Sequence, residues 1–232
     1  MLLRVRITLP DRPGTLGQVA RTMGVSGADI VQVVVLERLG GRAVDDFTVV
    51  WPGAARVERL LAGLAAIPGV RVDGVWRAIG APTTSGQDAE LLAQVAANPA
   101  DGVATLVDAA PGLLAADWAV AAVVPVDWAA RSGTAAAVGH ASWRTPVPPP
   151  LPEVTPLRAR AISTPGGAHV AVAPFGRAGL VLVVARECAG TPTAAAFHAT
   201  EVDRLAQLVR AAAVILGDRL DLVGPAPVAA NP

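Results

Sequence analysis

The first 78 residues switch between two hydrophobic periodicities in a fixed order, and this order constrains the fold more than any other feature. Four stretches are valine-rich or carry apolar side chains at every second position, as strands do: residues 3–9, 30–39, 42–51 and 70–75. Two stretches repeat apolar residues at helical spacing: residues 15–23 and 57–64. Gly40-Gly41 suits a tight hairpin between the second and third strands. The predicted order is therefore β-α-β-β-α-β.

This order predicts a ferredoxin-like sandwich of the α+β class, with an antiparallel sheet, two helices on one face and the spatial strand order 4-1-3-2. The second strand then lies at the edge of the sheet. Its run Ile30–Leu36 is apolar on both faces, and a bare apolar edge tends to pair with another strand. We predict a homodimer in which this strand pairs with its counterpart about a two-fold axis. The alternative is that a second domain covers the edge.

A short loop between the first strand and the first helix resembles the D-R-P-G-x-L signature of ACT domains, which are amino-acid-binding regulatory domains. Asp29-Ile30, at the start of the second strand, also fits this family. The likeness covers about a third of the chain and implies a ligand bound between the loop and the edge strand of a partner subunit. The ligand-binding residues it implies are Asp11, Arg12, Pro13, Gly14, Thr15, Leu16, Asp29, Ile30 and Val31.

The chemistry of the loop is also suited to an amino acid. Pro13 stiffens the turn, and Gly14 leaves room for the backbone of a ligand. The helix that follows offers free N–H groups and a partial positive charge to a carboxylate, and Asp11 can accept a hydrogen bond from an ammonium group. The alternative is a plain turn capped by Asp11, in a domain that serves only assembly. Asp45 and Asp46 are neighbours on a strand and point to opposite faces, so we do not expect a paired acid site.

The remainder of the chain predicts a linker at residues 79–87, a second domain at 88–220 and a disordered tail at 221–232. The proline-rich segment 145–156 is expected to form a stiff, exposed loop. Helices are expected around residues 89–95, 103–107 and 202–216, and strands at 120–126, 134–140, 158–163, 169–175 and 180–186.

Two helices, a sheet and a long final helix resemble the GAF domain. The likeness rests on the stretch Pro174–Val184 and on Phe197, which precedes the final helix. It implies an α/β domain with an antiparallel sheet that holds a small ligand. Cys188 either anchors a chromophore or is a small core residue. Three tryptophans either line a pocket or pack in the core: Trp118, Trp128 and Trp143.

Composition excludes several kinds of chemistry. All 19 basic residues are arginine, and the absence of lysine rules out lysine-anchored pyridoxal phosphate and an ordinary P-loop. A single cysteine rules out an intramolecular disulfide and a cysteine-based zinc site. The formal net charge is zero, so the protein as a whole has no positive electrostatic field that would attract nucleic acid. The G-x-S-x-G, H-E-x-x-H and G-x-G-x-x-G motifs are missing.

These observations predict a non-catalytic regulatory protein that binds an amino acid at an ACT dimer interface. The alternative is a dimerisation or adaptor protein without amino-acid binding, whose second domain binds another small ligand or a partner protein. We expect no cofactor, no metal, no nucleic acid and no membrane partner, and a separate output protein because the chain shows no output module. The bias toward alanine, valine, arginine and glycine suggests a GC-rich bacterial genome. Met1–Leu9 lacks the apolar core of a signal peptide, so a cytoplasmic location is expected.

Overall fold

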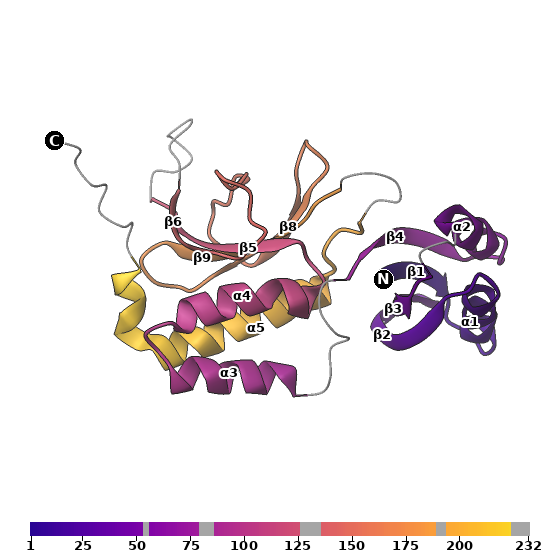
Figure 1. Ribbon diagram of the computed structural model, residues 1–232, viewed down its shortest axis with the longest axis horizontal. Helices are drawn as coiled ribbons and strands as arrows, with labels where there is room; N and C mark the ends of the chain where they lie inside the picture. The colour runs from indigo at the N-terminus through magenta and orange to yellow at the C-terminus, as the bar shows by residue number, and fades with distance from the viewer. Residues whose placement is uncertain (53–55, 79–85, 126–135, 189–193, 224–232) are drawn as a thin grey trace. The chain divides into compact units, whose positions relative to one another are not determined.

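The structure, a computed structural model, describes residues 1–52, 56–78, 86–125, 136–188 and 194–223 (Figure 1). The chain divides into two compact units, each with its own antiparallel sheet. The first unit contains Met1–Pro82 together with Cys188–Ala195, and the second contains Thr83–Glu187 together with Ala196–Pro232. The segment Cys188–Ala195 therefore groups with the first unit, although the sequence analysis placed it inside a continuous second domain. The linker expected at 79–87 lies mostly outside the described residues.

The first unit has the predicted order of elements. These are β1 (Leu2–Pro10), α1 (Thr15–Val25), β2 (Asp29–Leu39), β3 (Arg42–Val50), α2 (Val57–Ala65) and β4 (Arg71–Arg77). All three strand pairings are antiparallel, and the spatial order is β2-β3-β1-β4, as predicted. Strand β2 therefore lies at one edge of this sheet.

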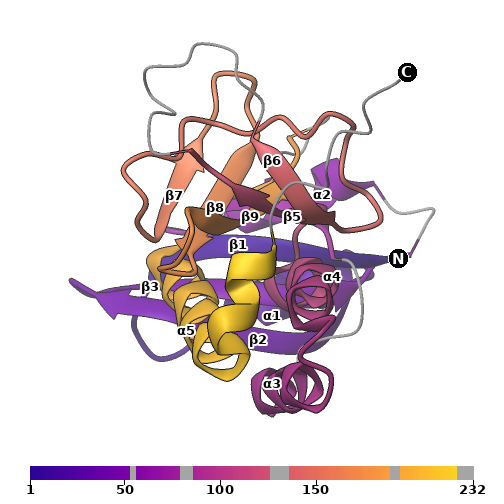
Figure 2. The same cartoon turned by 90° about the vertical axis from the view of Figure 1, so that its left-hand side faces the viewer.

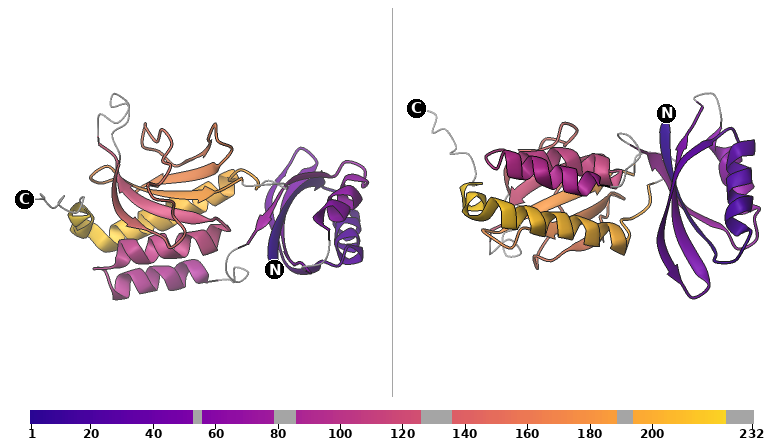
Figure 3. Two further views of the ribbon diagram at one scale, coloured as in Figure 1. Left: turned by 45° about the horizontal axis from the view of Figure 1, so that its top comes forward. Right: turned by 90° about the horizontal axis from the view of Figure 1, so that it is seen from below.

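The core of the first unit follows from the alternation in β1. Leu3, Val5, Ile7 and Leu9 share one face of the strand and are buried in a single apolar cluster. Side chains from both helices complete this cluster, among them Val19 and Met23 of α1 and Leu60 and Leu64 of α2. Both helices lie on the same face of the sheet (Figure 3).

The second unit is a five-stranded antiparallel sheet with helices on one face (Figures 1 and 2). Its elements are α3 (Gln87–Ala97), α4 (Gly102–Leu114), β5 (Trp118–Val123), β6 (Ala137–Ala141), β7 (Arg160–Ser163), β8 (His169–Pro174), β9 (Leu180–Arg186), α5 (Ala199–Leu216) and a 3₁₀ helix (Gly217–Leu222). The spatial order of the strands is β6-β5-β9-β8-β7. One apolar cluster lies between the sheet and the helices, and a smaller one lies on the opposite face.

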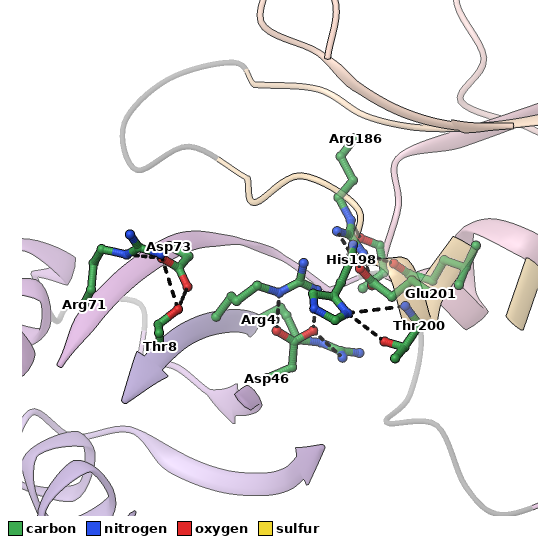
Figure 4. A network of polar contacts seen from close by, with 12 residues as sticks. Arg4, Thr8, Asp46, Arg71, Asp73, Arg186, His198, Thr200 and Glu201 are labelled. Atoms are coloured by element: carbon green, nitrogen blue, oxygen red, sulfur yellow. Dashed lines mark hydrogen bonds and ion pairs between the residues drawn. The ribbon is translucent and has the colours of Figure 1, made fainter. Parts of the chain in front are cut away.

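A buried ion pair joins the sheet of the second unit to its last helix (Figure 4). Arg186, at the end of β9, is fully buried and donates hydrogen bonds to Glu201 in the first turn of α5. It also donates to the carbonyl oxygens of Leu114 and Ala115, and its guanidinium stacks on Phe197 at 4.0 Å from the ring centroid. The sequence analysis did not single out this arginine.

Three expectations for the second half need correction or completion. Segment 145–156 is irregular as predicted, but it is not exposed throughout, because Val154 is buried and Leu151 packs on the smaller apolar cluster. Residues 221 and 222, which were expected to belong to a disordered tail, lie in the 3₁₀ helix, and residues 224–232 lie outside the described residues. The strand expected at 134–140 is Ala137–Ala141, and residues 126–135 lie outside the described residues.

In the described part of the chain, no helix is both long and apolar enough to cross a membrane.

Candidate functional site

The loop between β1 and α1 is fixed against the hairpin turn between β2 and β3. The backbone N–H of Asp11 donates to the carbonyl oxygen of Gly41 at 2.9 Å. Gly14 then adopts φ of +91°, in the left-handed region that favours glycine, and serves as the N-cap of α1. No neighbouring heavy atom lies within 4 Å of the position that a Cβ would take there, so this side of the loop is open.

The start of α1 carries no capping side chain. Gly14 cannot supply one, and the first turn contains no acidic residue. The first N–H groups of an α-helix have no partner within the helix and carry a partial positive charge. The loop therefore presents an uncapped helix N-terminus beside the hairpin, and this suits an anionic group.

An ion pair borders the same loop. Arg38, near the end of β2, donates from Nε and Nη2 to the two carboxylate oxygens of Asp11, each at 2.9 Å. The Arg38 side chain is 67% exposed, and exposed pairs contribute little to stability. The hydrogen bonds from Arg38 to Asp11 also raise the pKa of Arg38. Its role is to hold the Asp11 carboxylate beside β2.

Asp45 provides a second carboxylate near this pair, and it is buried. It lies on the helix-covered face of β3, opposite Ile7 of β1 and Val35 of β2, and it is only 3% exposed. Its Oδ1 atom has no hydrogen-bond partner in the described structure. Burial is the largest cause that raises the pKa of Asp45; the charges of Asp11 and Asp46 add to it, and Arg38 opposes it. A buried carboxylate oxygen without a donor is suited to an incoming cation.

Asp46 faces the other side of the sheet and is fully paired (Figure 4). Arg6 donates to it from Nε at 2.6 Å and from Nη2 at 2.8 Å, and Arg4 donates from Nη1 at 3.5 Å. The prediction that Asp45 and Asp46 point to opposite faces of the sheet is therefore confirmed. On the same face, Asp73 accepts hydrogen bonds from Thr8 and Arg71 (Figure 4).

The structure divides the predicted site residues into two groups. Residues 11–14 and Leu16 are exposed at the loop, whereas Thr15 is buried. Asp29 lies opposite Val50 and therefore at the Leu2 end of the sheet, while the loop follows Pro10, which lies opposite Arg42. Eight residue steps along β1 separate these two ends, or roughly 26 Å in a strand. Within one chain, Asp29, Ile30 and Val31 do not meet the loop.

The sequence analysis did not name two residues of this site among the predicted ligand-binding residues. Arg38 is 27 positions from Asp11, and no sequence pattern links the two. Asp45 had a detectable signal, because Ala43, Phe47 and Val49 face the core from alternate positions and an aspartate interrupts that apolar series. A charged residue at a core-facing position of a strand is a functional candidate.

No protein-family model matches the chain. No curated protein matches it either. A formyltetrahydrofolate deformylase from Pseudomonas putida KT2440 is a structural neighbour at 16% identity and a TM-score of 0.30, and the match covers 42% of this chain and 39% of the deformylase. An unknown protein from Galdieria sulphuraria is 12% identical, with a TM-score of 0.31, over 79% of this chain and 78% of that one.

The regulatory subunit of aspartate kinase from Thermus thermophilus is 18% identical, with a TM-score of 0.28, over 42% of this chain and 70% of that one. The match to the deformylase spans 39% of that protein, which is well under half of its length. Likenesses with TM-scores near 0.3 assign neither a family nor a function to this chain.

Proposed function

We propose that this protein is a non-catalytic regulatory protein whose N-terminal ACT-type domain, residues 1–78, binds an amino acid at the interface of a homodimer. The observation that carries the proposal is the pairing of two complementary groups at one loop. An uncapped helix N-terminus follows Gly14, and the buried Asp45 carboxylate, with an unpartnered oxygen, lies near Asp11 and Arg38. A helix N-terminus suits a carboxylate and Asp45 suits an ammonium group, and a free amino acid carries both.

The edge position of β2 supports the homodimer. Val33 is 39% exposed and Val35 is 52% exposed, and both lie on the strand that ends the sheet. Apolar side chains on an edge strand favour pairing with another strand. The middle residue of β2 is Val34, so a two-fold axis there pairs Ile30 of one copy with Arg38 of the other.

This pairing would bring together the two groups of predicted site residues. In a single chain, the loop lies near the Arg38 end of β2 and Asp29–Val31 lie at its other end. In the dimer, the loop of one copy, residues 11–16, meets Asp29, Ile30 and Val31 of the second copy. Each dimer then has two equivalent sites, and neither is complete without both chains. We propose that Asp11, Arg12, Pro13, Gly14, Thr15 and Leu16 bind from one copy and Asp29–Val31 from the other.

We further propose that residues 88–220 form a GAF-like domain and that the ligand signal passes to a separate output protein. The five-stranded antiparallel sheet and the long final helix support this reading of the second unit. The division of the chain into two compact units is compatible with separate ligand-binding and signalling parts.

Thermal unfolding with each proteinogenic amino acid in turn tests the proposal. A ligand at a hundredfold above its Kd adds about 2.7 kcal/mol to stability, so we expect a selective rise in Tm for one or a few amino acids. The substitution Asp45→Asn should abolish the rise, because an amide holds an ammonium group far less strongly than a carboxylate does. Asp203→Asn, at an exposed position on α5, is the matched control and should leave the rise unchanged.

Two outcomes would contradict the proposal. If no amino acid raises Tm while the protein sediments as a dimer, the first domain serves assembly only. If an amino acid raises Tm equally in the wild type and in Asp45→Asn, the ligand binds elsewhere.

A further inference from the structure

A cavity of about 510 Å³ lies on the face of the second sheet that the helices do not cover. Its volume falls within the range of about 300–1,000 Å³ that is usual for small-molecule sites. The indole of Trp118 and the side chains of Val170 and Ile162 come from three strands of the sheet, and Leu151 comes from the proline-rich segment. The walls are mostly apolar, so the cavity suits an apolar body.

The proline-rich segment forms one wall and is held in place from inside the second unit. Leu151 and Val154 pack on the apolar cluster that underlies the cavity. Arg160 of β7 donates from Nη2 to the carbonyl oxygens of Glu153 and Thr155, each at 3.2 Å, and its Nη1 donates to the carbonyl oxygen of Pro156. These bonds tie the segment to the sheet, so the wall is preformed rather than built around a ligand.

Among the described residues that line the cavity, the charged side chains are Glu153 and Glu187, and none is basic. Glu187 accepts a hydrogen bond from Trp118 Nε1 at 3.0 Å through Oε1, and its backbone N–H donates to Asp117 at 2.8 Å. The Asp117 carboxylate therefore adds negative charge at this end. Hydrogen bonds from the side chain and backbone of Thr155 lower the pKa of Glu153, so that carboxylate is ionised at neutral pH.

We propose that this cavity binds a small apolar amine, with the apolar body against Trp118 and Ile162 and the ammonium group at the carboxylate of Glu187. An anionic ligand would meet two carboxylates, and none of the lining side chains that the structure describes is a cation. A neutral apolar ligand would cover part of both carboxylates without bringing a counter-charge to them. An ammonium group brings that counter-charge and donates a further, charge-assisted hydrogen bond. This site lies in a different unit from the proposed amino-acid site and does not depend on it.

Calorimetric titration of the full chain with three probes of similar size tests the proposal. The probes are 3-phenylpropylamine, 3-phenylpropanol and 3-phenylpropionate, which share an apolar body and differ in charge. We expect the amine to bind at least about tenfold more tightly than the alcohol, because hydrogen bonds to charged groups contribute about 1.5–3 kcal/mol, and we expect no binding of the carboxylate.

Substitutions assign the binding to this cavity. Glu187→Gln keeps an oxygen that accepts from Trp118 but removes the charge, so the affinity for the amine should fall about tenfold while that for the alcohol is unchanged. Ile162→Trp fills the cavity and should abolish binding of both. Asp203→Asn, on the helix-covered side of the sheet, should change neither affinity.

The proposal fails if the amine does not bind, or if the carboxylate binds as tightly as the amine. It also fails if Glu187→Gln and Asp203→Asn have the same effect, or if Ile162→Trp, shown to be folded by circular dichroism, still binds the amine. None of these results bears on the amino-acid site, which is tested with Asp45→Asn.

Discussion

At the residue scale, the two adjacent aspartates of β3 show how the face of a strand decides the role of a side chain. Asp46 is buried and accepts hydrogen bonds from two arginines, so its charge is compensated. Asp45 is buried with an unpartnered oxygen, so its charge costs stability. Proteins often lose some stability at the residues that they use for function. Asp45 fits this pattern, because it weakens the fold and lies at the candidate site.

We predict that Asp45→Asn makes stability less dependent on pH. Burial raises the pKa of Asp45 in the folded protein above its unfolded value of about 3.9, so the folded state binds this proton more tightly. The stability that this group contributes is present below the unfolded pKa and is lost as pH rises through the folded pKa. The variant should therefore be more stable than the wild type at pH 7 and equal to it below about pH 4. Urea unfolding across this range measures the difference.

The neighbouring substitution Asp46→Asn is the control and should have the opposite sign. It removes the negative charge that pairs with Arg6, whose side chain is 4% exposed, and breaking a buried ion pair costs about 3–5 kcal/mol. Equal destabilisation by both substitutions at pH 7 would show that Asp45 is compensated by a donor and would weaken its assignment to a ligand site.

At the scale of elements, the edge strand β2 carries the proposed dimer. A two-fold axis at Val34 places Val33 of each copy opposite Val35 of the other, on the same face of the joined sheet. Substitutions at Val33 and Val35 therefore test both the interface and its register.

We predict that the double substitution Val33→Lys with Val35→Lys separates the dimer, because it places like charges opposite one another at both symmetry-related positions. Like charges across an interface cost several kcal/mol, so the Kd of the dimer should rise by about a hundredfold in sedimentation velocity. Val33→Lys with Val35→Glu pairs opposite charges at the same positions and should leave a dimer. If the two double variants sediment alike, the register proposed for β2 is wrong. Val25→Lys, on the exposed last turn of α1, is the control for an added charge away from the strand.

At the scale of the whole molecule, a segment of the first unit follows most of the second unit in the sequence. Cys188–Ala195 belongs to the first unit, and the chain then re-enters the second unit at Ala196. Ala195 lies close to Gly74 of β4. A Cβ at Gly74 would lie 2.5 Å from the backbone nitrogen of Ala195, closer than real Cβ contacts allow.

We predict that Gly74→Ala lowers the free energy of unfolding by about 1–3 kcal/mol, since a backbone segment rather than a flexible side chain must move. Gly112→Ala, inside α4 and with no heavy atom within 4 Å of the new Cβ, is the matched control. It should stabilise the protein by up to about 1 kcal/mol, because alanine favours a helix over glycine. Chemical denaturation compares the two. A neutral result at Gly74 would mean that Ala195 does not pack on β4.

The sequence by itself determined the order of elements in the first unit, the order of strands in its sheet and the opposite faces of Asp45 and Asp46. These features follow from local periodicity and from the handedness of crossovers, which act over a few residues or one connection. The same patterns located most helices and strands of the second unit. The ACT-type and GAF-like assignments rest on resemblance and remain proposals.

The tertiary structure alone decided which distant residues meet. Arg38 reaches Asp11 because the hairpin turn folds back against the loop, and Asp29 is kept from that loop by the length of β1. The return of Cys188–Ala195 to the first unit and the packing of Leu151 over the second sheet were equally invisible in the sequence. The physical reason is that hydrophobic periodicity determines on which face of a helix or strand a side chain lies. Contacts between residues far apart in the sequence depend instead on strand register and on the packing of whole elements.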